Sequence, residues 1–205
     1  YNQSRGADGR EYPIPISLLI SATAPVEDVR GAVTINFKEA GDPLYLLGVG
    51  MRGMGGSVYN ELFRSGNGAV AALDMKAAVR LYAAVMKTMR AGCVAAAHDV
   101  SQGGLAVTLS EMAFSGGFGA EVDLAGAARE KGLSGVELLF GESPARLVLE
   151  VRKDAEPAFL RLMKGLPAAR IGYVKEAELL TVSDGSPLLS EELPVLKDCW
   201  RRELI

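Results

Sequence analysis

Several residue types are scarce in this chain of 205 residues, and each scarcity excludes a class of protein. The two cysteines, Cys93 and Cys199, lie too far apart for a zinc-binding pattern and do not form a disulfide framework. A single histidine, His98, excludes histidine-rich metal sites. The apolar run 14–24 is interrupted by Pro and Ser and is too short to cross a bilayer, and no signal-peptide pattern opens the chain. We therefore expect a reduced, cytoplasmic protein without a membrane partner.

A basic excess is also absent. The sequence has 22 Lys and Arg against 25 Asp and Glu, a net charge of −3, whereas nucleic-acid-binding domains are usually basic. Apolar residues make up 49% and charged residues 23%, which is typical of soluble globular domains and excludes wholesale disorder. Glycine is abundant instead, with 24 residues, many of them in pairs. We expect no nucleic-acid partner.

The first residues differ in composition from the rest. Residues 4–12 are polar and contain glycine, which is typical of a linker, and the chain opens on Tyr1 without an initiator Met. We interpret residues 1–12 as a linker left from a preceding domain, and residues 13–205 as one folded domain.

Hydrophobic periodicity predicts interleaved strands and helices. The expected strands cover residues 13–23, 44–49, 93–97, 120–124, 146–151, 171–174 and 179–182. The expected helices cover 58–63, 74–90, 105–114 and 155–164, with a short terminal helix after Leu193-Pro194. Some strands follow one another directly, so the pattern favours an α+β fold, a mixed sheet flanked by helices in three layers.

The junction between the strand 93–97 and the next helix carries the most chemical information. It reads His98-Asp99-Val100-Ser101-Gln102-Gly103-Gly104. Glycines at a helix start let the backbone approach a ligand, and the free N–H groups there suit a phosphate. The alternative is a tight turn in which Ser101 is the N-cap and Asp99 holds His98.

A second candidate is the turn before the strand 146–151, which reads Gly141-Glu142-Ser143-Pro144-Ala145-Arg146. Glu142 could hold a metal or a sugar hydroxyl, and Ser143 and Arg146 a phosphate. The alternative is an ion pair between Glu142 and Arg146 that stabilises the turn. The loop 48–57 contains Gly-x-Gly after a strand, but it lacks the acidic residue of a dinucleotide site. A flexible loop before a helix capped by Ser57 explains it equally well.

Five segments occur together in the order typical of one enzyme family. They are Phe-Lys-Glu-Ala-Gly-Asp-Pro-Leu-Tyr-Leu-Leu-Gly at 37–48, Gly55-Gly56-Ser57, His-Asp-Val-Ser-Gln-Gly-Gly-Leu at 98–105, Phe140-Gly141-Glu142-Ser143 and Ile171-Gly172-Tyr173-Val174. From about Pro13 onward the chain resembles the phosphoribosylformylglycinamidine synthase family, in its C-terminal-type domain. The element 98–105 alone also resembles aminoimidazole ribonucleotide synthetase, selenophosphate synthetase, thiamine-monophosphate kinase and hydrogenase maturation proteins.

The resemblance implies an ATP-dependent carbon–nitrogen ligase of purine biosynthesis, with ATP and Mg as cofactors of the full enzyme. It implies that the catalytic histidine lies in N-terminal-type domains outside this chain, so residues 1–205 alone are expected to be inactive. Its implied partners are those domains, a glutaminase and a small adaptor subunit. The implied nucleotide or phosphate contacts are His98, Asp99, Ser101, Gln102, Gly103, Gly104, Glu142, Ser143 and Arg146, with Asp99 also a metal ligand.

The similarity is to the second copy of the domain, whose pocket serves an auxiliary or structural nucleotide. Two other functions remain open: a domain of a related ATP-dependent enzyme, or a non-catalytic interaction domain in which the glycine turns are architecture. We also expect self-association, because the apolar residues of 13–24 and 51–54 would be exposed without the neighbouring domains.

Overall fold

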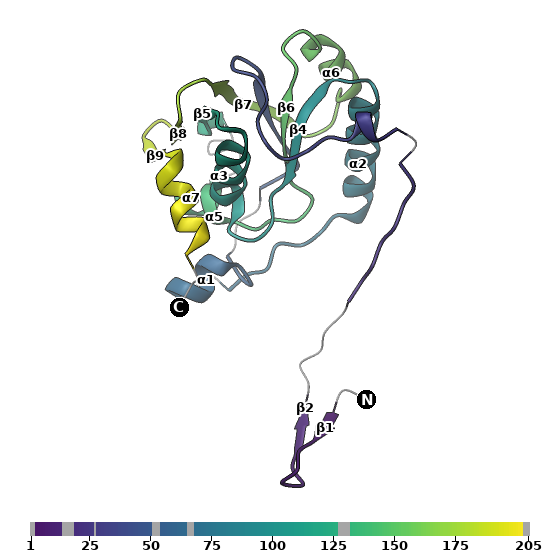
Figure 1. Ribbon diagram of the computed structural model, residues 1–205, viewed down its shortest axis with the longest axis vertical. Helices are drawn as coiled ribbons and strands as arrows, with labels where there is room; N and C mark the ends of the chain where they lie inside the picture. Colours follow the sequence, from purple (N-terminus) through teal and green to yellow (C-terminus); the bar gives the residue numbers. More distant parts are fainter. Residues whose placement is uncertain are drawn as a thin grey trace. The chain divides into compact units, whose positions relative to one another are not determined.

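The computed structural model describes residues 3–13, 19–26, 28–50, 54–64, 68–126 and 132–202. They fall into two compact units, Tyr1–Arg30 and Gly31–Ile205. The first contains an antiparallel hairpin of β1 (Gln3–Arg5) and β2 (Glu11–Pro13) (Figure 1). A short 3-10 helix, η1 (Val29–Gly31), follows at the boundary. The expected boundary after residue 12 stays a prediction.

The strand expected over 13–23 is wrong for the residues that can be compared. β2 ends at Pro13, residues 14–18 lie outside the described residues, and residues 19–23 form no strand. Leu19 and Ile20 are 93% and 74% exposed. In the described structure no sheet strand pairs with these residues, so their apolar alternation does not produce a strand. The sequence pattern alone could not show that a pairing strand was missing.

The second unit is built on a seven-stranded sheet in the order β4-β6-β3-β7-β5-β8-β9. The strands are β3 (Pro43–Leu47), β4 (Val94–Asp99), β5 (Gly119–Asp123), β6 (Leu147–Val151), β7 (Ala168–Lys175), β8 (Leu179–Ser183) and β9 (Pro187–Glu192). All neighbours pair antiparallel except β5 and β8, which are parallel. The expected mixed sheet is confirmed.

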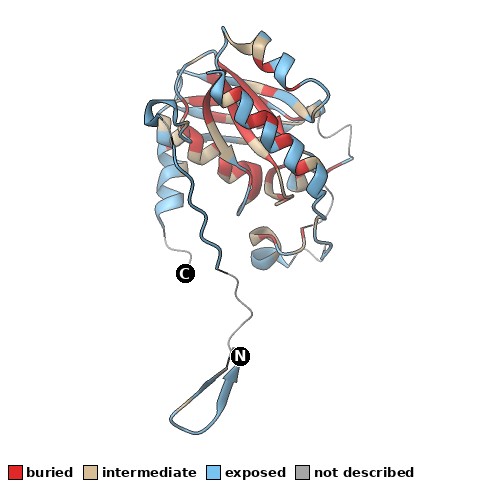
Figure 2. Cartoon of the chain, turned by 90° about the vertical axis from the view of Figure 1, so that its right-hand side faces the viewer, coloured by how far each residue is buried: buried red, intermediate tan, exposed pale blue. Residues whose placement is uncertain are grey.

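Helices cover both faces of the sheet, which gives the expected three layers (Figure 1, Figure 2). One face packs against α3 (Gly104–Gly116), α5 (Gly135–Phe140) and α7 (Leu193–Arg201). The other face packs against α2 (Met75–Arg90) and α6 (Glu156–Leu162). A further short helix, α1 (Val58–Phe63), begins after its N-cap Ser57, as the sequence predicts. Each face buries its own apolar core, so the sheet is the middle layer.

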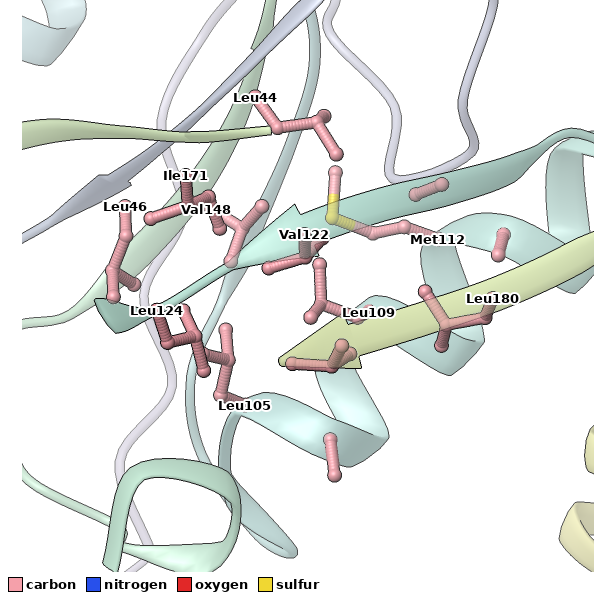
Figure 3. Packing of buried hydrophobic residues seen from close by; sticks show 14 of the residues in the cluster. Leu44, Leu46, Leu105, Leu109, Met112, Val122, Leu124, Val148, Ile171 and Leu180 are labelled. Atoms are coloured by element: carbon pink, nitrogen blue, oxygen red, sulfur yellow. The ribbon is translucent and has the colours of Figure 1, made fainter. Parts of the chain in front are cut away.

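The larger core lies under α3. Leu105, Leu109 and Met112 point from the helix onto Val122 and Leu180 of the sheet (Figure 3). These leucines and Met112 are fully buried. Burying a side chain of this size contributes about 1.5–3 kcal/mol, so the seating of α3 is one of the main sources of stability.

The long helix α2 follows the sequence expectation closely. Asp74 is its N-cap and accepts a hydrogen bond from the Ala77 N–H at 3.0 Å. Leu81 and Val85 are buried against the sheet. The helix ends at Arg90, and Gly92 follows with a φ of +70°, a left-handed conformation that favours glycine.

Sequence patterning missed β9. None of its six residues is buried, and its sequence, Pro-Leu-Leu-Ser-Glu-Glu, shows no apolar alternation. The strand forms because its backbone pairs with β8 at the sheet edge, from Leu179 opposite Glu192 to Ser183 opposite Pro187. Tertiary pairing, rather than local composition, creates this element.

Candidate functional site

The loops that carry the candidate residues all leave one edge of the sheet. The carboxyl ends of β3, β4 and β5 lie at this edge together with the amino ends of β6 and β7, because these strands alternate in direction. The turns 98–104 and 141–146 therefore meet. The Val100 N–H donates to the Arg146 carbonyl at 3.0 Å.

His98 lies at the end of β4 within a small polar cluster. Its Nδ1 is 3.2 Å from an Asp99 carboxylate oxygen, and its Nε2 is 3.0 Å from Glu111 Oε2 on α3. The other Glu111 oxygen accepts from the indole N–H of Trp200 on α7 at 2.8 Å. The sequence did not place Glu111 or Trp200 at this site, because both are distant from His98 along the chain and belong to no motif. The cluster ties β4, α3 and α7 together.

The start of α3 differs from the simple turn that was the alternative. Gly103, with a φ of +80°, is the N-cap, and no side chain caps the helix. Ser101 as N-cap is therefore wrong. Gly104 is also left-handed at +69°, so the two glycines shift the helix start beyond Ser101. Ser101 and Gln102 are exposed, whereas Gly104 is buried.

Glu142 joins this turn to α1. One of its carboxylate oxygens, Oε1, accepts hydrogen bonds from the Gly103 N–H and from the Val58 N–H, each at 2.9 Å. An acidic group suits both positions, because the first N–H groups of a helix have no internal partner. Glu142 is thus occupied by backbone contacts, and among the described residues no ion pair joins it to Arg146. The Glu142–Arg146 ion pair, which was the alternative interpretation of this turn, is therefore wrong. Ser143 is buried, at 2% exposed.

Arg146 lies buried beside the same turn, at 4% exposed. Its Nη1 donates to the Gly141 carbonyl at 3.3 Å, and its Nε has no hydrogen-bond partner in the described structure. Burial lowers the pKa of this guanidinium to about 10, because the charged form loses water. A buried cation of this kind is costly unless an anion pairs with it.

A cleft of about 850 Å³ has Arg146 in its lining and extends along β7 as far as Lys175. Its lining also includes Leu46, Gly48, Gly50 and Leu138. Among the described residues, the predicted turn 98–104 does not line it. The volume is in the range of small-molecule sites. The structure thus brings Arg146 together with the Gly-x-Gly loop, a combination that the sequence analysis did not predict.

The described residues do not fit a resident metal ion. No three His, Cys, Asp or Glu side chains gather as a metal site in this part of the chain. Asp99 is paired to His98, and the neighbouring Glu111 is held by His98 and Trp200. Asp99 as a metal ligand stays a prediction that would need ligands from elsewhere. Likewise, no helix in the described residues is long and apolar enough to cross a bilayer.

The fold and the meeting of two glycine-rich turns at one end of the sheet define a three-layer α+β domain with a cleft that Arg146 and β7 line. Comparison with known families identifies this type of domain. The chain belongs to the family of the AIR synthase related protein, C-terminal domain, whose model matches residues 39–185.

Similar curated proteins are subunits or whole enzymes of one synthase. The chain is 35% identical over 210 aligned residues to the phosphoribosylformylglycinamidine synthase subunit PurL of Moorella thermoacetica, a match that covers 100% of this chain and 27% of the relative. It is 36% identical to a probable phosphoribosylformylglycinamidine synthase of Arabidopsis thaliana, over 95% of this chain and 14% of the relative. The chain therefore spans about a quarter of the length of the bacterial relative.

Solved structures share the fold. Thermotoga maritima PurL complexed with FGAR matches with a TM-score of 0.70 at 20% identity, over 82% of this chain and 30% of the other. The PurLQS structure from the same organism gives 0.68 at 20% identity, over 82% and 28%. The Escherichia coli hydrogenase maturation protein HypE gives 0.53 at 22% identity, over 78% and 51%.

Proposed function

We propose that this chain is a C-terminal-type domain of a phosphoribosylformylglycinamidine synthase. The observation that carries the proposal is a sequence similarity that spans 95–100% of the chain in a bacterial and a plant relative. The enzyme class is that of an ATP-dependent carbon–nitrogen ligase, which converts formylglycinamide ribonucleotide with ATP and ammonia from glutamine to formylglycinamidine ribonucleotide.

The fold comparison supports the same choice among the alternatives. The TM-score is 0.70 for PurL and 0.53 for HypE, so the hydrogenase maturation fold is the more distant of the two. The proposed cofactors of the whole enzyme are ATP and Mg, and a T. maritima PurL structure is complexed with ATP. The proposed partners are N-terminal-type domains, a glutaminase and a small adaptor subunit.

Within that enzyme, this domain acts as a lobe that supplies cleft walls and contacts to its neighbours. No catalytic residue is assigned to it. His98 is held by Asp99 and by Glu111, a carboxylate that also holds Trp200, so it serves the packing of α3 and α7. Residues 1–205 by themselves are accordingly expected to show no synthase activity.

A domain exchange tests the proposal. The segment of the M. thermoacetica subunit that matches this chain is replaced by residues 1–205, and ATP- and ammonia-dependent formation of formylglycinamidine ribonucleotide is measured. We expect activity within about tenfold of the parent. A matched control chimera carries the corresponding segment of E. coli HypE and should be inactive. A folded chimera without activity, or equal activity in both chimeras, would argue for a general scaffold or a related enzyme instead.

A further inference from the structure

The solvent-facing side of α2 carries four large apolar side chains, which we call the α2 stripe. Met75 and Val79 are 64% and 63% exposed, and Tyr82 and Met86 are nearly half exposed. The buried residues of the helix are a different set: Ala78, Leu81, Ala84, Val85 and Thr88. The α2 stripe therefore does not belong to the core of the domain, and it lies at the surface (Figure 2).

The residues of the α2 stripe follow one another at intervals of four, three and four. This is the spacing of the a and d positions of a heptad repeat, so the four side chains form one line along the helix. At a rise of 1.5 Å per residue the line is about 16 Å long. Single apolar residues at a surface are normal, but a continuous line of them marks an interaction site. Anchors at this spacing fit a second helix.

A row of cations, which we call the basic flank, borders the α2 stripe. It consists of Lys76, Arg80, Lys87 and Arg90, all exposed. With 3.6 residues per turn they lie on one side of the stripe, and its other side adjoins the buried residues of the helix. No acidic residue lies in α2, and none of the four cations forms an ion pair within the described residues. A partner must therefore match an apolar line and a positive border.

From the α2 stripe and its basic flank we propose that α2 is the docking surface for an acidic amphipathic helix of a partner protein. The apolar residues of the partner pack between those of the stripe, and its Asp and Glu side chains lie opposite the basic flank. Charge complementarity favours this partner over a second copy of the chain. In an antiparallel pair of copies the two-fold axis sets each basic flank against the same flank of the other copy. The proposal goes beyond the proposed function and does not depend on it.

Binding of a designed helical peptide to the full 205-residue chain tests the surface. The probe has about three heptads, with Leu at the a and d positions and Glu at the flanking e and g positions. A second peptide carries Lys in place of every Glu. Fluorescence anisotropy of the labelled peptides measures affinity. We expect the acidic peptide to bind at least about tenfold more tightly than the basic one, or 1.4 kcal/mol. Its affinity should fall as the salt concentration rises.

Substitutions in the α2 stripe test the apolar part of the contact. Val79→Gln combined with Met86→Gln should weaken binding of the acidic peptide at least about tenfold. Both residues are exposed, so the unfolding temperature should stay close to that of the wild type. Val195→Gln is the matched control, because Val195 is an exposed valine on α7, which covers the opposite face of the sheet. This variant should bind the acidic peptide as the wild type does.

Reversing the charge of the basic flank tests the electrostatic part. Lys76→Glu, Arg80→Glu and Lys87→Glu together should invert the preference, so that the basic peptide binds more tightly than the acidic one. Failure of the wild type to bind the acidic peptide, or an unchanged preference after the reversal, would overturn the proposal. Self-association of the wild type that Val79→Gln with Met86→Gln abolishes would instead assign the surface to a second copy. Tighter binding to phosphatidylserine vesicles than to the acidic peptide would assign it to a membrane, and either result would overturn the proposal.

Discussion

Glu142 accepts a hydrogen bond from the Gly103 N–H at 2.9 Å, and this contact connects the two glycine-rich turns of the domain together with the bond from the Val100 N–H to the Arg146 carbonyl. The same Glu142 oxygen accepts from the Val58 N–H at 2.9 Å, so α1 joins the arrangement. The carboxylate occupies the place at the start of α3 where the sequence suggested a ligand phosphate. In this structure the carboxylate holds its own turn, the start of α3 and the start of α1 together at one end of the sheet.

Replacing Glu142 by alanine should therefore destabilise the domain. Two backbone N–H groups lose a charged acceptor, a loss of about 2–3 kcal/mol in the free energy of unfolding. Glu142→Gln keeps an acceptor oxygen and should cost about 1 kcal/mol. Urea denaturation measures both. Glu39→Ala is the control: its carboxylate forms an exposed ion pair with Lys153 at 3.5 Å, worth about 0–1 kcal/mol. Equal losses for Glu142→Ala and Glu39→Ala would contradict the assignment.

Alanine variants of two glycines with the same backbone conformation distinguish the cost of a left-handed residue from the cost of close packing. Gly92 and Gly104 have φ values of +70° and +69°. A Cβ at Gly92 meets nothing within 4 Å, whereas one at Gly104 would lie 2.6 Å from the Leu139 carbonyl oxygen. Gly92→Ala should cost about 1–2 kcal/mol from the left-handed conformation alone. Gly104→Ala should cost at least about 3 kcal/mol, because α3 must move away from α5.

Thermal unfolding of both variants measures the difference. The buried start of α3 also predicts that Gly104→Ala loosens the larger core, so protection from hydrogen exchange should fall in α3 and α5. Similar stability in the two alanine variants would show that the approach of α3 to α5 is easily relaxed.

Glu150 should make stability depend on pH. It lies in β6 with 0% exposure and accepts from the backbone N–H groups of Lys38 and Glu39. Burial is the main cause that raises its pKa to about 7 from an ordinary value of 4.5. The folded state then holds this proton more tightly than the unfolded state. Its contribution to stability is complete below about pH 4.5 and is lost as the pH rises to about 7.

Glu150→Gln removes the titration and keeps an acceptor for the two backbone groups. The difference in the free energy of unfolding between wild type and variant should change by on the order of 1–3 kcal/mol between pH 5 and pH 8, in the direction that penalises the wild type at high pH. Urea denaturation at four pH values across this range measures it. A difference that is constant over the range would show that Glu150 stays ionised in the folded protein.

Trp200 is the only tryptophan in the sequence, so its fluorescence reports the docking of α7. Its indole N–H donates to Glu111, and its ring packs against Phe114 with centroids 5.6 Å apart. Glu111→Ala should shift the emission to longer wavelength and increase quenching by iodide, because α7 loses its polar anchor on α3. Glu176→Ala, an exposed residue beyond β7, should leave the emission unchanged. An unchanged spectrum in Glu111→Ala would mean that apolar contacts alone hold α7.

Local patterns in the sequence determined much of the fold. The N-cap Asp74 and the spacing of Leu81 and Val85 specified α2, because helix capping and periodic burial are properties of neighbouring residues. The buried strands β3 and β6 were likewise visible as short apolar runs. Family motifs at 98–105 and 140–143 pointed to the domain type that the family model then matched.

Only the tertiary structure decided how polar groups found their partners. Glu142 is close in sequence to Arg146, and an ion pair between them was reasonable. The fold instead supplies two backbone N–H groups, on Gly103 and Val58, that satisfy the carboxylate. Arg146 is left in a buried position beside a loop nearly a hundred residues away in the sequence. Such contacts depend on which strands terminate at the same end of the sheet. β9 likewise forms only because its backbone pairs with the partner strand β8. Long-range backbone pairing sets these contacts, and no local pattern of residue types encodes it.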